Sequence, residues 1–446
     1  MSFPISEASP VRFPSPLPAR ADVVVIGGGV IGVMTAWFLR ERGLSVVVCE
    51  KGRIAGEQSG RNWGWVRQQG RDPGELPIMV ESLSIWQRLA SQMGDGLGFK
   101  QTGVLYLAKT DREIEGFEAW TEHSRAHQLD TRLLTAGETM AMLKGAMAPW
   151  KGALFTASDA RAEPWVAVPA LAAVAGEKGV VIRESCAVRG LDLAAGRVAG
   201  VVTEAGRIAC DHVVVAAGAW SRLFLGRHGL DIPQLSVLAS VAATEPMPEI
   251  FPGNAADDDF AFRRRADGGY SIAPGGAHDF FIGRNAFASL RYYLTVLKKD
   301  FRSTNFRLAA PKGFPDAWGT PRRWELDRTS PFERQRILNP APNMQSLGKV
   351  QDSFARAFPA LGRPKLKSAW AGMIDSLPDV VPIVDHAPIP GLTIATGMSG
   401  HGFGIGPGMG RVVANLVTGQ PTGHDLSRFR LSRFSDGSRI EPGPSL

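Results

Sequence analysis

Three glycines and one acid near the start of the chain have the types and spacing needed to hold an adenine dinucleotide. An apolar run at residues 23–26 leads into Gly27, Gly29 and Gly32, which form a G-x-G-x-x-G turn ahead of a helical stretch. Glycine allows the tight turn, the close approach of backbone to a pyrophosphate, and the packing of helix on strand. A second apolar run ends at Glu50, close to the spacing of about 20 residues at which an acid meets a ribose hydroxyl. The pattern predicts a dinucleotide site, and Glu50 disfavours a ribose that carries a 2′-phosphate.

The elements that must position this turn form a predicted βαβ unit, in which Gly43 ends the helix. Residues 112–143 are charged and are predicted to be helical. Short alternating runs over residues 187–210 are typical of an antiparallel meander. The apolar run 213–221 breaks at small residues, and a third apolar run leads into the glycine-rich loop 397–410, after which a helix is predicted. Three apolar strands therefore end in small or glycine-rich turns, where a ligand can approach the backbone.

Length and composition indicate a globular protein. Its 446 residues, 44% of them hydrophobic and 21% charged, suffice for two domains. No apolar stretch approaches the roughly 20 residues that span a bilayer, and we expect the first 20 residues, rich in proline and serine, to be no signal peptide. The three cysteines have no C-x-x-C spacing, which favours a reducing compartment, and we predict a cytoplasmic location. The spacing of histidines and cysteines predicts no metal site.

The net charge of +7 would suit an anionic partner. The basic residues are spread along the chain, however, and no nucleic-acid-binding motif is present. We expect no nucleic-acid partner and no transmembrane segment, while peripheral contact with a membrane surface stays open.

Glycine-rich or small-residue loops after three buried strands, near both ends and in the middle of the chain, are an unusual combination. With this arrangement the chain resembles the D-amino-acid-oxidase-like (DAO) family of FAD-dependent oxidoreductases over nearly its whole length. Segments 43–47, 50–59 and 218–224 are most similar to the bacterial L-amino acid deaminases. The loop 399–403 (SGHGF) is similar instead to the sarcosine and glycine oxidase branch.

The chain pattern and the resemblance together imply an α/β fold, in which a discontinuous Rossmann-like FAD-binding domain is interleaved with a mixed-sheet α+β substrate domain. We expect a flexible lead at 1–20, FAD-binding parts at 21–105, 161–231 and 362–430, substrate-domain parts at 106–160 and 232–361, and a polar tail at 431–446.

The resemblance also implies FAD as the cofactor. Covalent family members attach flavin to a cysteine in the C-terminal loop, and this chain has none there, so we expect non-covalent FAD. The glycine turn would contact the pyrophosphate, Glu50 the adenosine ribose, Val188 the adenine, and loop 400–404 the flavin pyrimidine edge. The residues expected to bind the cofactor are Gly27, Gly29, Val30, Ile31, Gly32, Glu50, Lys51, Gln58, Ser59, Gly60, Arg61, Asn62, Gly64, Val188, Gly218, Trp220, Gly372, Gly400, His401, Gly402, Phe403 and Gly404.

The reaction implied is hydride transfer from a substrate C–H bond to flavin N5, after which water hydrolyses the imine to a keto acid and ammonia. An arginine fork would hold the substrate carboxylate. The resemblance gives Arg263 this role, and Arg67 is the second candidate. His401, expected beside the flavin, would stabilise negative charge on the reduced ring or bind substrate.

The favoured substrate is an amino acid, with oxygen or a quinone as electron acceptor. Oxidation of a secondary amine or polyamine is the alternative reaction. A flavin-binding sensor without catalytic activity is the alternative outside enzymes.

Overall fold

The predicted βαβ unit is present in the computed structural model, which describes residues 3–276, 278–300, 304–441 and 443. It consists of strand β1 (Val23–Ile26), helix α1 (Val30–Glu41) and strand β2 (Val46–Cys49). Gly27 has a φ of 113°, which L side chains rarely adopt, and a Cβ at Gly32 would lie 2.0 Å from the Gly27 carbonyl oxygen. Helix α1 can therefore pack directly against the turn only because both positions are glycine. Gly43, with a φ of 84°, follows the end of α1 as predicted.

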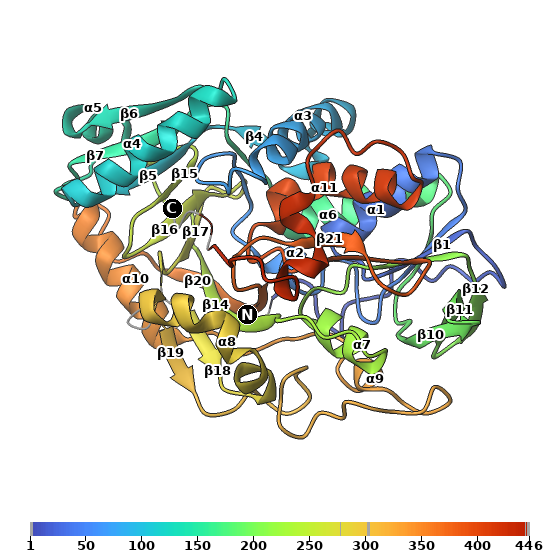
Figure 1. Ribbon diagram of the computed structural model, residues 1–446. Helices are drawn as coiled ribbons and strands as arrows, with labels where there is room; N and C mark the ends of the chain where they lie inside the picture. The colour runs from blue at the N-terminus through green and yellow to red at the C-terminus, as the bar shows by residue number, and fades with distance from the viewer. Residues whose placement is uncertain (1–2, 277, 301–303, 442, 444–446) are drawn as a thin grey trace.

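Strands from distant parts of the chain form one six-stranded sheet in the order β21-β22-β13-β1-β2-β9. The added strands are β9 (Val181–Arg183), β13 (His212–Val215), β21 (Ile383–His386) and β22 (Leu392–Thr396). All neighbours are parallel except β21, which runs antiparallel to β22. Figure 1 shows α1 (blue) beside α11 (red), so the two ends of the chain meet in this domain. The α/β fold with a discontinuous Rossmann-like domain is confirmed.

The two faces of this sheet are covered by different layers. Val23, Val25, Val46 and Val48 belong to a core shared with α1, α3 (Leu76–Met93), α6 (Pro164–Glu177) and α11 (Gly402–Val417). The intervening residues of β1 and β2 pack toward the predicted meander, which is present as β10 (Val188–Ala194), β11 (Arg197–Thr203) and β12 (Gly206–Ala209). Valine on both faces is what a strand buried on both sides requires.

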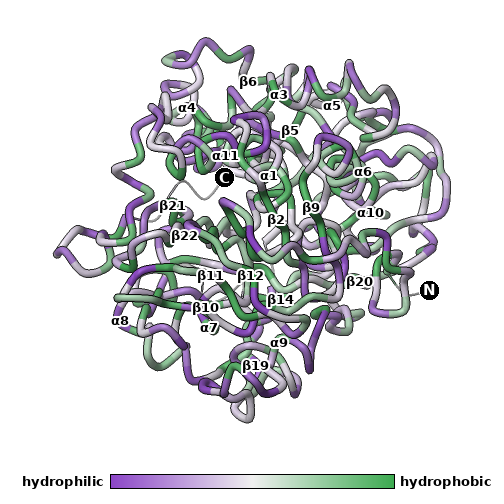
Figure 2. Tube along the Cα trace, turned by 90° about the vertical axis from the view of Figure 1, so that its right-hand side faces the viewer, coloured by the Kyte–Doolittle hydropathy of each residue, from purple (hydrophilic) through white to green (hydrophobic). Residues whose placement is uncertain are grey.

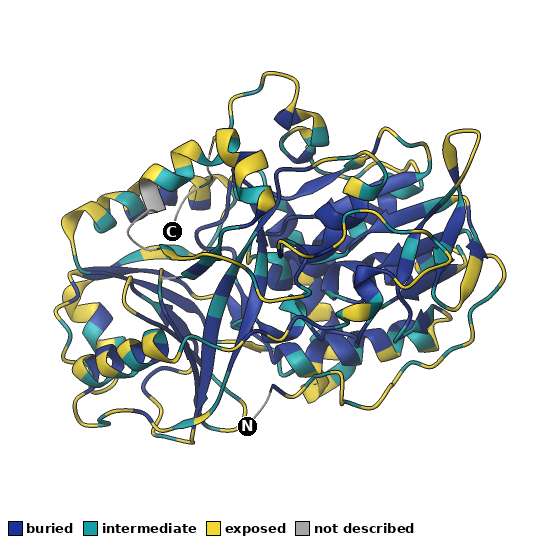
Figure 3. Cartoon of the chain, turned by 90° about the horizontal axis from the view of Figure 1, so that it is seen from below, coloured by how far each residue is buried: buried dark blue, intermediate teal, exposed yellow. Residues whose placement is uncertain are grey.

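A second, mixed sheet of ten strands carries the other half of the molecule, in the order β19-β18-β14-β17-β16-β15-β5-β7-β6 with β20 beside β14. Its strands are β5 (Val104–Ala108), β6 (Thr131–Thr135), β7 (Gly152–Thr156), β14 (Leu235–Thr244), β15 (Asn254–Ala256), β16 (Ala261–Arg264), β17 (Tyr270–Ala273), β18 (His278–Phe281), β19 (Thr304–Arg307) and β20 (Leu366–Ser376). Helices α4 (Asp111–Ala126), α5 (Ala136–Met142) and α10 (Met344–Ala357) pack against it. Figure 2 shows hydrophobic stretches along strands such as β2, and Figure 3 shows exposed residues mainly on the outer helices and loops.

Other helices and short strands lie outside the elements described so far. They are β3 (Trp65–Val66), β4 (Lys100–Gln101), β8 (Ala160–Arg161), α2 (Gln58–Arg61), α7 (Ser221–Arg227), α8 (Arg284–Asp300) and α9 (Pro331–Arg334).

Two predicted elements are wrong in their extent. The stretch 112–143, predicted to be helical, contains strand β6 between α4 and α5, because Leu133 and Leu134 pair with β7. The glycine-rich stretch 397–410, predicted to be a loop, is helical from Gly402 onward. Its glycines serve helix packing, since a Cβ at Gly410 would lie 2.6 Å from Met34 of α1.

Packed side chains occur both in the expected lead and in the expected tail. Phe3 is 4% exposed, and its ring centroid lies 5.9 Å from that of Trp165 and 5.8 Å from that of Trp370. Near the other end, the buried Arg433 forms an ion pair with Asp379 at 2.7 Å. Aromatic and charged partners far away in the sequence supply these contacts.

The crossing of α1 and α11 predicts a stability effect of Gly410→Ala. The added methyl group has no space, so we expect the free energy of unfolding to fall by about 1–3 kcal/mol. Gly176→Ala is the matched control, because a methyl group at this glycine of α6 would meet no atom within 4 Å outside the neighbouring turns of its own helix. Alanine there should stabilise by about 0.5–1 kcal/mol. Urea unfolding of both variants measures the difference, and equal stability would contradict the packing described.

Candidate functional site

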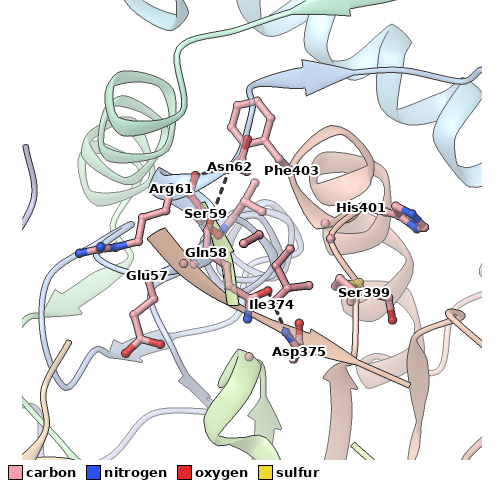
Figure 4. A pocket seen from close by; sticks show the side chains of 18 of the residues that line it. Glu57, Gln58, Ser59, Arg61, Asn62, Ile374, Asp375, Ser399, His401 and Phe403 are labelled. Atoms are coloured by element: carbon pink, nitrogen blue, oxygen red, sulfur yellow. Dashed lines mark hydrogen bonds between the residues drawn. The ribbon is translucent and has the colours of Figure 1, made fainter. Parts of the chain in front are cut away.

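A cavity of about 970 Å³ lies where the parallel strands of the six-stranded sheet end. Ile26, Cys49, Ala216 and Thr396, at or just after the carboxyl ends of β1, β2, β13 and β22, line it, which is where open α/β sheets bind ligands. Residues of β14 and β20 from the second sheet close the other side. Figure 4 shows side chains of α2 near Ile374 and Asp375 of β20, with the start of α11 at the far side.

Most of the predicted cofactor residues meet in this one cavity. The lining includes Gly27, Gly29, Val30, Ile31, Glu50, Lys51, Gln58, Ser59, Arg61, Asn62, Val188, Gly218, Trp220, Gly372, Gly400, His401, Gly402 and Phe403, and also Arg67. Gly32, Gly60, Gly64, Gly404 and Arg263 are not among the lining residues.

The glycines outside the lining support the cavity wall from behind. A Cβ at Gly60 would lie 2.2 Å from the Ala55 carbonyl oxygen, so only glycine lets α2 pack there. The Gly404 carbonyl accepts hydrogen bonds from Ser82 Oγ (2.8 Å) and Trp86 Nε1 (2.9 Å), which tie α11 to α3. These positions act through packing.

The turn after β1 has the donors that a pyrophosphate needs. Ser59 Oγ accepts the N–H of Val30 at 2.9 Å, while the N–H groups of Gly29 and Ile31 have no acceptor among the described residues. A Cβ at Gly29 would lie 3.0 Å from Ser59 Oγ, so a side chain there would crowd the cradle. Free N–H groups at the positive end of α1 suit phosphate oxygens. The residues therefore fit the pyrophosphate of FAD.

Glu50 is held at the predicted ribose end of this cradle. Its carboxylate accepts the N–H of Gly28 at 2.7 Å and that of Gly52 at 2.6 Å, and burial raises its pKa. Each oxygen keeps acceptor capacity for a further donor such as a ribose hydroxyl. Lys51 is committed to protein groups instead, with its Nζ 2.8 Å from Glu57 and 4.3 Å from the Trp220 ring centroid.

A cationic loop forms another part of the lining. The guanidinium of Arg67 lies 5.5 Å from the ring centroid of Tyr106 and donates to the Gln69 carbonyl. Arg71, which we did not predict, is buried; its Nε donates to the Arg67 carbonyl at 3.1 Å and its Nη2 to the His401 carbonyl at 3.0 Å. Burial lowers the pKa of Arg71 to about 10, so it remains a cation at neutral pH. The signal in the sequence was a second arginine four positions after Arg67.

Asp159 fixes the backbone of the loop that carries Arg67. It accepts the N–H of Gln68 at 2.7 Å and that of Gln69 at 3.2 Å, and burial raises its pKa to about 6. No local pattern distinguished this acid, because its partners lie about 90 residues earlier in the chain.

Arg263, our first candidate for holding a substrate carboxylate, lies outside the cavity. It is 1% exposed, and its Nη1 and Nη2 donate to the two carboxylate oxygens of Glu163 at 2.8 and 2.9 Å. Its Nε would lie 2.8 Å from a Cβ at Gly64, so the Arg263 side chain packs directly against that glycine. The geometry assigns Arg263 to an internal ion pair and leaves Arg67 as the candidate for the carboxylate.

A further group of charged residues lines the cavity next to α4. Arg112 and Glu113 of α4 contribute, together with Asp257 and Asp258 after β15. Lys109 Nζ pairs with Asp257 at 2.8 Å. Burial, with Glu113 and Asp257 nearby, raises the pKa of Asp258.

Other features can be stated for the described residues alone. Within them, no group of three or more His, Cys, Asp or Glu side chains could hold a metal ion. None of their helices combines the length and apolar character needed to cross a bilayer. Cys49, Cys186 and Cys210 are free and buried.

The internal ion pair predicts that Arg263→Met is a stability variant. Because it leaves the buried Glu163 unpaired, we expect the free energy of unfolding to fall by about 3–5 kcal/mol, with recovery in the Arg263→Met/Glu163→Met double variant. Urea unfolding and substrate titration of both variants test this. A large rise in KM at unchanged stability would return the carboxylate role to Arg263.

Comparison with known proteins agrees with this geometry. The family model for FAD-dependent oxidoreductases (DAO) matches residues 22–416. The chain is 25% identical to the β subunit of sarcosine oxidase from Rhizobium meliloti, over 96% of this chain and 92% of that protein. It is similar to the structure of L-amino acid deaminase from Proteus myxofaciens in complex with anthranilate, at a TM-score of 0.91 and 31% identity, covering 97% of this chain and 98% of that one. It is also similar to L-proline dehydrogenase from P. horikoshii, at a TM-score of 0.77 and 26% identity, covering 95% and 100%. The chain belongs to the DAO family of FAD-dependent oxidoreductases, as the resemblance of its sequence had indicated.

Proposed function

We propose that this FAD-dependent enzyme oxidises an α-amino acid, giving an imino acid that water hydrolyses to a keto acid and ammonia. The observation that carries the proposal is the cationic lining around Arg67, beside the start of α11. The similar structure from Proteus myxofaciens is of an L-amino acid deaminase. A deep cavity with a cation at one end suits a small substrate that carries a carboxylate.

Arg67 is the residue we propose to bind that carboxylate. It lines the cavity, is only half-buried, and among the described protein groups its guanidinium donates to the Gln69 carbonyl alone. The guanidinium lies 5.5 Å from the Tyr106 ring centroid, a cation–π contact that leaves donors for a bidentate contact with a carboxylate.

FAD, when bound, supplies the hydride acceptor. The chain's own contribution is to hold the substrate carboxylate, to exclude water with aromatic walls, and to orient the Cα–H bond. Trp65, Tyr106 and Phe117 line the cavity and supply such walls. We propose that FAD is held without a covalent bond, because loop 397–404 contains no cysteine.

A secondary amine is the second candidate substrate, favoured by the relation to the β subunit of sarcosine oxidase. The electron acceptor, oxygen or a quinone, remains a prediction, as does the cytoplasmic location.

The first experiment is a substrate screen read by loss of flavin absorbance. We expect anaerobic bleaching by α-amino acids and none by polyamines, which lack a carboxylate. Arg67→Ala should weaken amino acid binding about 10- to 100-fold, the cost of a charged hydrogen-bonded pair. Arg112→Ala, which removes an exposed arginine at the same cavity, is the control and should bind normally.

The screen also separates the alternatives. Bleaching by secondary amines in preference to primary amino acids would favour the second candidate. Flavin that no amine or amino acid bleaches would contradict an enzyme of this class and favour the sensor.

We further propose that peripheral membrane contact, if it serves a quinone acceptor, uses the outer face of α8. Phe287, Leu290 and Leu294 are 64%, 48% and 50% exposed there. Residues 284–298 include Arg284, Arg291 and Lys298 and no acid. An exposed apolar stripe with flanking cations suits an anionic lipid surface.

Vesicle sedimentation tests this surface. We expect binding to vesicles of phosphatidylcholine with phosphatidylglycerol, weaker binding to phosphatidylcholine alone, and loss of binding in Leu290→Ser/Leu294→Ser. Met147→Ser, at an exposed methionine elsewhere, is the control. No binding, or a dimer that the double variant dissolves, would contradict membrane contact through α8.

A further inference from the structure

Four buried polar atoms beside the cationic lining have no hydrogen-bond partner within the described part of the chain. They are Arg71 Nη1, Glu75 Oε1, Glu75 Oε2 and His401 Nδ1. The three residues face one another, because Glu75 Oε2 lies 3.5 Å from Arg71 Nη1 and 3.6 Å from His401 Nδ1. Buried polar atoms without partners are rare in folded proteins, and they collect where a site has a task other than packing.

Glu75 is the negative charge at the centre of this group. Its side chain is 1% exposed and precedes the first turn of α3, where the helix dipole favours an anion. Burial raises its pKa, but His401, Arg71 and Arg67 outweigh burial, so the pKa of Glu75 lies below its usual value. The carboxylate is therefore ionised at neutral pH.

His401 stands between this carboxylate and the cavity. Its Nδ1 is buried against Glu75, while the side chain as a whole is 23% exposed and His401 is among the residues that line the cavity. Figure 4 shows His401 at the start of α11, across from Gln58 and Ser59. Arg71 Nη2 fixes the backbone of His401 through its carbonyl oxygen.

The protonation state of His401 follows from its neighbours. Burial lowers its pKa, Arg71 and Arg67 lower it further, and Glu75 opposes them. Glu75, Arg71 and Arg67 are the charged groups with the largest effects on the imidazole. The ring is therefore neutral at pH 7 and can accept a proton.

We propose that Glu75 and His401 form a carboxylate–imidazole pair that removes a proton from the substrate ammonium group. The proposal rests on the proposed function, because an α-amino acid arrives as an ammonium ion and its nitrogen lone pair must be free before hydride can leave Cα. His401 Nε2 forms a bond to the proton as the substrate N–H bond breaks. The Cα–H bond then breaks with its electron pair, which reduces FAD, and the nitrogen lone pair forms the C=N bond. Glu75 is a positioning residue, which directs Nδ1–H toward its carboxylate and stabilises the imidazolium.

The pH profile of Glu75→Gln tests the pair. Without the carboxylate, His401 loses its proton more readily, so the acidic limb of kcat/KM should move down by about 1 pH unit. The rate kcat should fall about 100-fold, a typical loss for impaired general base catalysis. Glu75→Asp, which keeps the charge, should return the limb toward its original position, and His401→Gln should abolish it.

A second measurement needs no turnover. Histidine labelled with ¹⁵N in the FAD-loaded enzyme reports the pKa of His401 directly, with its signal assigned by His401→Gln. We expect this pKa to fall in Glu75→Gln, while that of His228, about 4 in the native protein, stays unchanged.

An unchanged acidic limb, or an unchanged pKa of His401 in Glu75→Gln, would overturn the pair. If Glu75→Gln does not retain flavin, His401→Gln provides the test: an acidic limb of kcat/KM that is still present in this variant would overturn the proposed pair. If no amino acid reduces the flavin, the proposed function fails, yet the ¹⁵N titration still decides whether Glu75 and His401 are coupled.

Discussion

The absence of side chains in the turn between β1 and α1 is the constraint on which the rest of the site depends. A Cβ at Gly27 would lie 2.4 Å from the carbonyl oxygen of Ala216, which follows β13. The turn can therefore touch a strand that comes much later in the chain. This contact aligns the ends of the parallel strands, and it leaves backbone N–H groups of α1 facing the cavity.

Charge is distributed differently in the two halves of the cavity. At the nucleotide end, the backbone of the glycine turn and the Glu50 carboxylate line the cavity. At the other end, Arg67 and Arg71 lie close to His401 and to the carboxylates of Glu75 and Asp159. Arg263 is not among the lining residues and is paired with Glu163 within the protein.

The sequence predicted what local pattern can express. The βαβ unit, the end of α1 at Gly43 and the meander are confirmed, because turn residues and β-branched runs act over short distances. The predicted start of α11 was wrong because its glycines are required by close packing against α1 and α3. These contacts are with distant parts of the chain and leave no local signal in the sequence. The ion pair of Arg263 could not be predicted for a similar reason, since its partner Glu163 lies 100 residues away. Arg71 and Glu75 carry no motif, and only the fold brings them to His401.

The interleaving of the two domains also sets the order in which the protein can mature. One wall of the cavity comes from the turn after β1. Another comes from the end of β22 and the start of α11, a helix that ends at Val417. During synthesis on the ribosome, most of the chain must therefore emerge before the flavin pocket is closed. Cofactor loading is consequently a late step. Until β13 and β22 have been synthesised, the apolar strands β1 and β2 lack their partners in the sheet and stay unpaired or are shielded by chaperones.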